Sequence, residues 1–201
     1  MRKTNVDQML NLFYEARKLY SKREKEDAKK KYSQALDLNQ NFIIARLERG
    51  KMNFGLDYEQ ALFDFEEVLK QDPKNIKALK GIAISLKMKG NYEEALYYAQ
   101  KGLKKNQTSP QLNFHLADCN KFIGKNQEAL YYINRAIEQK KNKYEKKLKV
   151  YYQNKAEIYL GLNDFGNAKC FIEEALKIDQ NYESARIIEK RIDEKQLANI
   201  S

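Results

Sequence analysis

Apolar residues recur along this chain with the spacing of helix faces. In the first stretch they follow one another at intervals of 3, 1, 3, 3 and 1 residues, as on one face of a helix: Met9, Leu12, Phe13, Ala16, Leu19 and Tyr20. Later stretches keep the helical period, with charged residues between the apolar positions. The pattern predicts an all-α chain of amphipathic helices.

A short phrase centred on an alanine returns through the chain, and its clearest copy runs from Gly90 to Leu96. The alanines follow at intervals of 33, 34, 34 and 39 residues: Ala28, Ala61, Ala95, Ala129 and Ala168. A fixed period in this range is typical of a solenoid of stacked helical units. We expect a single domain over 1–201, with units at about 9–42, 43–75, 76–109, 110–143 and 144–182 and a capping helix at about 183–199.

Local signals agree with this division. Thr4 and Asp7 have the spacing of a capping box that opens a helix. Pro73 should end the helix before it. Pro110 can begin a helix, because backbone N–H groups of the first turn have no partner within the helix and proline loses no hydrogen bond there. Gly90 can take the left-handed conformation that ends the first helix of its unit.

The repeat resembles the tetratricopeptide repeat (TPR) family over residues 9–182. In that family two small residues let the helices of one unit approach closely, and the matching pairs here are Ala16 with Ala28, Gly50 with Ala61, Ala83 with Ala95, Ala117 with Ala129 and Ala156 with Ala168. A third small position packs on the next unit: Ala35, Val68, Gly102, Ala136 and Ala175. The resemblance implies a right-handed superhelical solenoid of five helix pairs plus a C-terminal capping helix. The second unit lacks one residue near Gly55, which should alter its turn.

Composition limits the class of protein. The 201 residues are 42% hydrophobic with only 2 Pro and 8 Gly, which fits an almost wholly helical globular chain. No apolar run is long enough to span a membrane, and residues 1–7 lack the apolar stretch of a secretory signal. We therefore expect a cytoplasmic location, with ciliary or cytoskeletal association included, and not secretion. Cys119 and Cys170 are expected to be free thiols.

The formal charge of +10 raises acidic peptides, anionic membranes and nucleic acid as partners. The TPR resemblance implies a ligand in the concave groove lined by the first helix of each pair. At the matching positions lie Phe13, Arg17, Tyr20, Lys51, Phe54, Lys77, Lys80, Ile84, Lys87, Phe114, Lys121, Phe122 and Gln153. Because the stretch 76–89 has four lysines and no acid, we expect this groove to bind an acidic or amphipathic peptide. The alternative is that these lysines form a solvated face.

A second basic feature follows the fourth unit, where five extra residues lengthen the repeat. The stretch 140–149 should form helix ends and their loop, and it carries six lysines and one glutamate: Lys140, Lys141, Lys143, Lys146, Lys147 and Lys149. Such a patch could contact nucleic-acid phosphates or acidic protein tails, or it could only solvate a helix end. Arginine is scarce in it and Tyr144 is its one recognisable aromatic platform, which argues against nucleic acid.

Chemistry beyond binding finds little support in the sequence. His115 and Cys119 could share a helix face, but two ligands do not make a zinc site, and no catalytic triad or phosphate loop is present. We expect no metal, no cofactor and no enzymatic activity. The leading interpretation is a scaffold that holds a peptide or a subunit within a larger assembly, and the alternatives are an RNA-binding helical repeat and a chaperone adaptor. For the adaptor, only Lys77 matches the pattern that clamps a C-terminal carboxylate.

Overall fold

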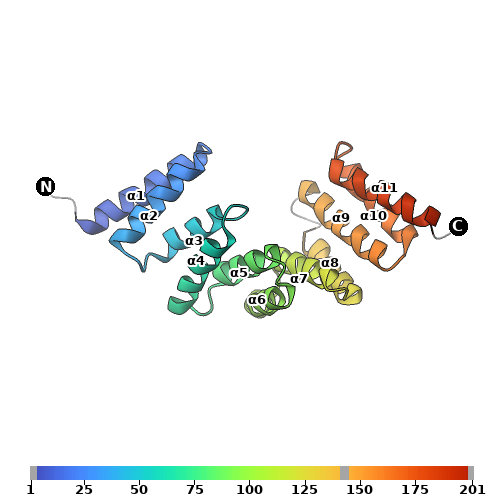
Figure 1. Ribbon diagram of the computed structural model, residues 1–201, viewed down its shortest axis with the longest axis horizontal. Helices are drawn as coiled ribbons and strands as arrows, with labels where there is room; N and C mark the ends of the chain where they lie inside the picture. Colours follow the sequence, from blue (N-terminus) through green and yellow to red (C-terminus); the bar gives the residue numbers. More distant parts are fainter. Residues whose placement is uncertain (1–3, 141–144, 199–201) are drawn as a thin grey trace. The chain divides into compact units, whose positions relative to one another are not determined.

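A computed structural model describes residues 4–140 and 145–198. Over these residues the chain forms eleven helices and no strand: α1 (Asn5–Ser21), α2 (Lys25–Leu38), α3 (Ile43–Met52), α4 (Tyr58–Gln71), α5 (Ile76–Met88), α6 (Tyr92–Lys105), α7 (Pro110–Phe122), α8 (Asn126–Lys140), α9 (Glu145–Gly161), α10 (Phe165–Ile178) and α11 (Glu183–Ala198) (Figure 1). The all-α prediction is therefore confirmed. Within the described ranges no helix is both long and apolar enough to cross a lipid bilayer.

The contacts divide the chain into two compact units, Met1–Asn91 with α1 to α5 and Tyr92–Ser201 with α6 to α11. In the first unit, α1 packs on α2, and α4 packs on both α3 and α5. In the second, α7 pairs with α8, α9 pairs with α10, and α11 covers α10. The boundary falls inside the third predicted repeat, and the prediction of one continuous domain stays a prediction.

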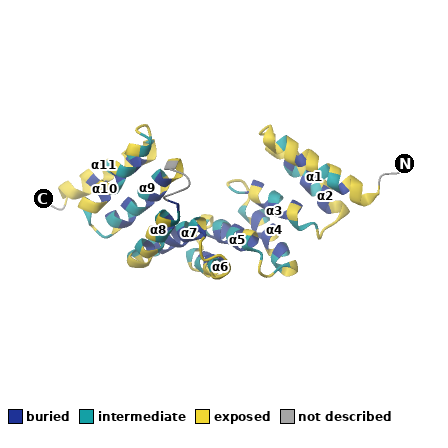
Figure 2. Cartoon of the chain, turned by 180° about the vertical axis from the view of Figure 1, so that it is seen from behind, coloured by how far each residue is buried: buried dark blue, intermediate teal, exposed yellow. Residues whose placement is uncertain are grey.

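The alanines that define the repeat have a common place in the core. Ala28, Ala61, Ala95, Ala129 and Ala168 are all fully buried. The small residues that the TPR resemblance pairs with them are buried as well, from Ala16 to Ala156. Figure 2 shows that the helices carry both buried segments (dark blue) and exposed segments (yellow). Small side chains at these contacts permit a short distance between the helix axes. Larger side chains would overpack the contact between the helices.

Two glycines of the first unit accommodate one ring. A Cβ atom on Gly81 would lie 2.5 Å from the Phe65 ring, and one on Gly50 would lie 2.9 Å from it. Phe65 is fully buried, so its ring fills the space that side chains on α3 and α5 would otherwise occupy. Glycine in a helix costs about 1 kcal/mol relative to alanine, and here the close approach of Phe65 requires it.

The helix ends follow the predicted signals. The capping box of Thr4 and Asp7 is present at α1, α4 ends before Pro73, and Pro110 begins α7. Gly90 has φ +84°, the left-handed conformation expected of it. The one-residue loss in the second unit has the expected effect on the turn. There α3 has only 10 residues and the left-handed Gly55 stands six residues before Ala61, whereas Gly90 stands five before Ala95.

The extra residues of the last repeat lengthen a helix. α9 has 17 residues, compared with 13 in α7, and α8 continues to Lys140. Residues 141–144 lie outside the described part of the chain, so the expected loop cannot be compared there. The predicted capping helix is confirmed as α11, which buries Ala185, Ile188 and Ile192.

Candidate peptide-binding groove

A small cavity opens between α3, α4 and α5. Its volume is about 110 Å³, and we call it the lysine groove; its lining residues are Lys51, Phe54, Phe65, Lys77, Lys80, Gly81 and Ile84. Five of these were predicted as groove residues: Lys51, Phe54, Lys77, Lys80 and Ile84. Phe65 and Gly81 were not among the predicted groove residues.

The sequence of α5 explains why these side chains meet. Lys77, Lys80 and Ile84 are spaced by 3 and 4 residues, so they lie on one face of the helix. The opposite face is buried in the first unit through Leu79, Ile82, Ala83 and Leu86, among others. Because Gly81 has no side chain, the Phe65 ring reaches the floor of the groove beside Ile84. The result is an apolar floor with ammonium groups at its edge.

The charges of the lysine groove are not balanced by acids within it. Lys51 pairs with Glu48 at 2.6 Å, but among the described residues Lys77 and Lys80 have no ion pair. Burial lowers the pKa of Lys80, and the neighbouring charges of Lys51 and Lys77 lower it further. A carboxylate placed between these lysines would relieve their repulsion. The groove can thus accept an anionic group over an apolar surface.

The predicted residues of the first repeat do not form one exposed surface. Phe13 is buried, and its ring packs on Tyr32 at 5.7 Å and on Phe42 at 5.2 Å between ring centroids. It therefore belongs to the core between α1 and α2. Arg17 and Tyr20 are exposed on α1. Lys87 of α5 is half-buried.

In the second unit the predicted groove lysine of α7 is neutralised. Lys121 of α7 lies 3.1 Å from Asp118 and 2.5 Å from Glu157 of α9. Burial lowers the pKa of Lys121, but the two carboxylates together outweigh it and raise the pKa above the usual value. Gln153 donates to Glu157 at 2.8 Å and accepts from the Tyr182 hydroxyl. This face is already closed by its own ion pairs and hydrogen bonds.

The predicted aromatic residues of α7 are engaged in ring contacts within the second unit. Phe114 stacks on Tyr151 with 4.8 Å between centroids, and Phe122 stacks on Tyr92 at the same distance. Phe122 nevertheless keeps 55% of its surface exposed. Of the two, Phe122 is the one that a ligand could reach.

The basic patch is not a uniform surface. Lys140 is buried, with its ammonium 5.2 Å from the Tyr151 ring centroid, and Lys149 pairs with Asp179 at 2.5 Å. Lys146 and Lys147 are exposed. Lys141 and Lys143 lie outside the described residues. At least two of the six lysines are therefore occupied by contacts within the second unit, which reduces the charge that the patch can offer to a partner.

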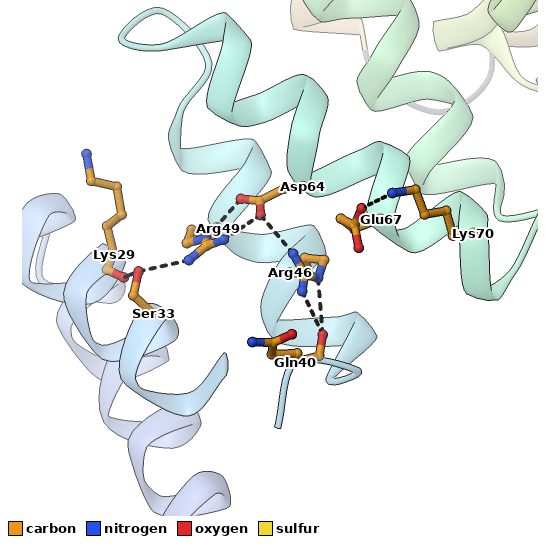
Figure 3. A network of polar contacts seen from close by, with 8 residues as sticks. All are labelled: Lys29, Ser33, Gln40, Arg46, Arg49, Asp64, Glu67 and Lys70. Atoms are coloured by element: carbon orange, nitrogen blue, oxygen red, sulfur yellow. Dashed lines mark hydrogen bonds and ion pairs between the residues drawn. The ribbon is translucent and has the colours of Figure 1, made fainter. Parts of the chain in front are cut away.

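A buried ionic network in the first unit was not predicted. Asp64 of α4 is fully buried and accepts two hydrogen bonds from Arg49, at 2.9 and 2.6 Å, while Arg46 lies 3.7 Å away (Figure 3). Arg49 also donates to the Ser33 hydroxyl of α2 at 3.1 Å. Burial raises the pKa of Asp64, and the guanidinium groups oppose that shift. Because it joins α2, α3 and α4, the network fixes the position of the helix that carries Lys51.

The position of Asp64 in the repeat could have suggested this burial. It stands three residues after Ala61 and directly before Phe65, on the side of α4 that faces the core. A carboxylate on such a stripe requires a partner, and Arg46 and Arg49 of the preceding helix are spaced to supply one.

Among the described residues, no group of three or more His, Cys, Asp or Glu side chains could hold a metal ion. Cys119 is buried and Cys170 is exposed, and within the described residues neither is part of a disulfide.

Comparisons with known proteins agree with this architecture. The family model described as "TT21 fifth ARM repeats domain" matches residues 39–160, and the model described as "Tetratricopeptide repeat" matches residues 150–182. Together they span most of the predicted repeats. No significant match is found among curated protein sequences.

Solved structures share the fold at low sequence identity. A tetratricopeptide repeat protein from Parabacteroides merdae ATCC 43184 aligns with a TM-score of 0.79 and 19% identity over 94% of this chain and 72% of its own. YrrB, described as a TPR protein with an unusual peptide-binding site, aligns with a TM-score of 0.68 and 22% identity over 89% and 90% of the two chains. The APC/C hetero-tetramer Cut9-Hcn1 aligns with a TM-score of 0.78 and 17% identity over 90% of this chain but only 35% of the other. At these identities the likeness concerns the fold alone.

Proposed function

From the premise that this chain belongs to the TT21 fifth ARM repeats family and is a tetratricopeptide repeat protein, we propose that it is a protein-interaction scaffold whose lysine groove binds an acidic, partly apolar peptide of a partner. The TPR fold is generally a non-enzymatic interaction module. The finer assignment to a groove and a class of peptide is our proposal.

The observation that carries the proposal is the imbalance of charge over an apolar floor. Within the described residues, Lys77 and Lys80 lie at one small cavity without an ion pair, above Phe65 and Ile84. Acidic residues of a partner would neutralise the lysines, and an apolar side chain would cover the floor. Charge would chiefly speed association, and the apolar contact would lengthen the life of the complex. The description of YrrB as a peptide-binding TPR protein lends the proposal support by analogy of fold.

The structure gives less support to the RNA-binding alternative. Lys140 is buried and Lys149 is paired with Asp179, so the basic patch offers fewer free charges than the sequence indicates. Phosphate binding depends on neutralisation by available lysines and arginines. The basic patch is therefore a weaker site for RNA than its sequence indicates.

The test is fluorescence anisotropy with a short labelled peptide in which glutamate alternates with leucine, and the same peptide with lysine for glutamate as a control. At about 150 mM salt, where long-range charge effects are screened, the wild-type chain should bind the acidic peptide only. We expect Lys77→Glu with Lys80→Glu to weaken binding by at least about tenfold, or roughly 1.4 kcal/mol.

A matched charge reversal controls for net charge. Lys22→Glu with Lys25→Glu changes the charge equally at two exposed positions, the residue after α1 and the first residue of α2, and should leave binding unchanged. Circular dichroism should show the same helical content in all variants. Equal affinities of the Lys77/Lys80 variant and the wild-type chain would refute the proposal.

A further inference from the structure

A larger groove lies in the second unit, on different helices. It lies between α8 and the second half of α6, including the residues that follow α6, and its volume is about 460 Å³. We call it the outer groove. Its lining residues are Gln100, Leu103, Lys104, Gln107, Tyr132 and Arg135. None of the residues of the lysine groove takes part in it. In Figure 1, α6 (green) and α8 (yellow) are the second helices of their repeats.

We propose that the outer groove is a second binding site, which takes an acidic, extended segment of a protein partner. This site does not depend on the proposed function of the lysine groove. It would allow the chain to hold two acidic segments at once, on first-helix and second-helix positions of the repeat.

The charge of the outer groove favours an acidic occupant. Its lining includes two cations, Lys104 and Arg135, and no acid. Neither cation has an ion pair among the described residues, although Arg135 donates to the Tyr131 hydroxyl at 2.8 Å. Lys105 adds another positive charge to the last turn of α6. Carboxylates of a partner would thus meet cations without displacing an existing ion pair.

The surface beside the groove has the composition of a protein interface. Tyr97 and Tyr131 stand one 34-residue period apart and are 58% and 54% exposed. Each has a cation four residues later over its ring: Lys101 at 5.9 Å and Arg135 at 5.6 Å from the ring centroids. Tyrosine and arginine are enriched where proteins contact one another.

The same rings argue for peptide rather than nucleic acid. A base would stack on an open aromatic face, but a cation already lies over each of these tyrosines. The amides of Gln100 and Gln107 can both donate and accept, as a peptide backbone requires, and Leu103 with Tyr132 offers apolar surface. A second copy of this chain is a poor occupant, because two chains of net charge +10 repel each other.

The experiment isolates the outer groove by first removing the lysine groove. In the Lys77→Glu/Lys80→Glu background, the labelled glutamate–leucine peptide should still bind, and adding Lys104→Glu with Arg135→Glu should weaken it by at least about tenfold. Lys190→Glu with Lys195→Glu on α11 is the matched control and should change nothing. A photoreactive peptide should cross-link to α6 and α8. Unchanged affinity after the Lys104/Arg135 reversal, or cross-links confined to other helices, would overturn the proposal.

Two further measurements keep the result unambiguous. The milder Lys104→Gln/Arg135→Gln variant should weaken the peptide in the same direction, and circular dichroism should confirm that it is folded. A labelled single-stranded oligonucleotide is tested in parallel at about 150 mM salt. If it binds through Lys104 and Arg135 while the acidic peptide does not, the protein-partner proposal is wrong.

Discussion

The first helices of the repeats carry lysines in both units, but their surroundings differ. On α3 and α5 the lysines stand at an apolar cavity, and within the described residues Lys77 and Lys80 have no acidic partner. On α7 and α9 the corresponding face holds Lys121 between Asp118 and Glu157. One backbone architecture therefore carries an open cationic surface in one unit and an internally neutralised surface in the other. The difference lies in two carboxylates beside Lys121, one on its own helix at Asp118 and one on α9 at Glu157.

The largest expected effect concerns the scaffold under the lysine groove. Asp64→Asn would remove the buried carboxylate that pairs with Arg49 and Arg46, so we expect a loss of about 3 kcal/mol in the free energy of unfolding. Urea denaturation measures it. The control is Glu67→Gln on the same helix, which removes the pair with Lys70 and a weaker attraction to Arg46, and should cost at most about 1 kcal/mol. Similar losses in both variants would contradict this account of the network.

A smaller effect is expected at the floor of the lysine groove. A methyl group on Gly81 would press on the Phe65 ring, and we expect a net loss of about 1 kcal/mol, since overpacking of about 2 kcal/mol exceeds the gain in helix propensity. The matched variant on α5 is Ser85→Ala. The Ser85 hydroxyl is buried without a hydrogen-bond partner among the described residues, so its removal should stabilise the unit slightly. Thermal denaturation of the two variants should therefore shift in opposite directions.

The comparison between the units can be sharpened by making the second resemble the first. Glu157→Gln keeps the size of the side chain but removes one carboxylate from Lys121, whose pKa should fall as a result. We expect the acidic peptide to bind about threefold more tightly in the Lys77→Glu/Lys80→Glu background, since one partly exposed charge is worth less than about 1 kcal/mol. Anisotropy titration measures the change. Weaker binding in this variant would contradict the view that ion pairs close the face.

The smallest effect is a dependence on pH. Burial lowers the pKa of Lys80, and a lysine must be charged to attract a carboxylate. Affinity should therefore fall as the pH rises through this lowered pKa, while an ordinary lysine, with a pKa of about 10.4, is still charged. In Lys80→Arg the affinity should stay level, because arginine keeps its proton. If the affinity for the peptide declined equally with pH in the natural chain and in Lys80→Arg, a group other than Lys80 would be responsible.

The same shift predicts the sign of a stability change. Between the lowered pKa and the pKa of the unfolded chain, the unfolded state holds more protons at Lys80 than the folded state does. The contribution of Lys80 to the free energy of unfolding should therefore increase with pH in that window. Urea denaturation of the natural chain and of Lys80→Arg at several pH values measures the difference.

The repeat could be predicted from the sequence because its determinants are local and periodic. The regular spacing of the alanines from Ala28 to Ala168 predicts that they are buried. The resemblance to the TPR family then predicts that Lys51, Lys77 and Lys80 line the same groove. Helical period decides which way each of these residues points, so no knowledge of distant contacts is needed.

The partners of long charged side chains could not be predicted in this way. Glu157 reaches Lys121 from 36 residues away. Lys149 similarly finds Asp179 at a separation of 30 residues. These pairings depend on side-chain conformations and on contacts between helices, which the helical period alone does not specify. Counting charges along the sequence therefore overstated the basic patch and missed the closed face of α7 and α9.

Phe65 has a consequence for how such a groove could change its ligand. Its ring stands behind the lysines as a spacer, in contact distance of the backbones of both α3 and α5 at Gly50 and Gly81. A smaller side chain there would let the two helices close, and a larger one would wedge them apart. The distance between α3 and α5, and with it the width of the lysine groove, is thus set by a buried residue that no ligand would need to touch. A substitution at Phe65 could change that width without altering any lysine.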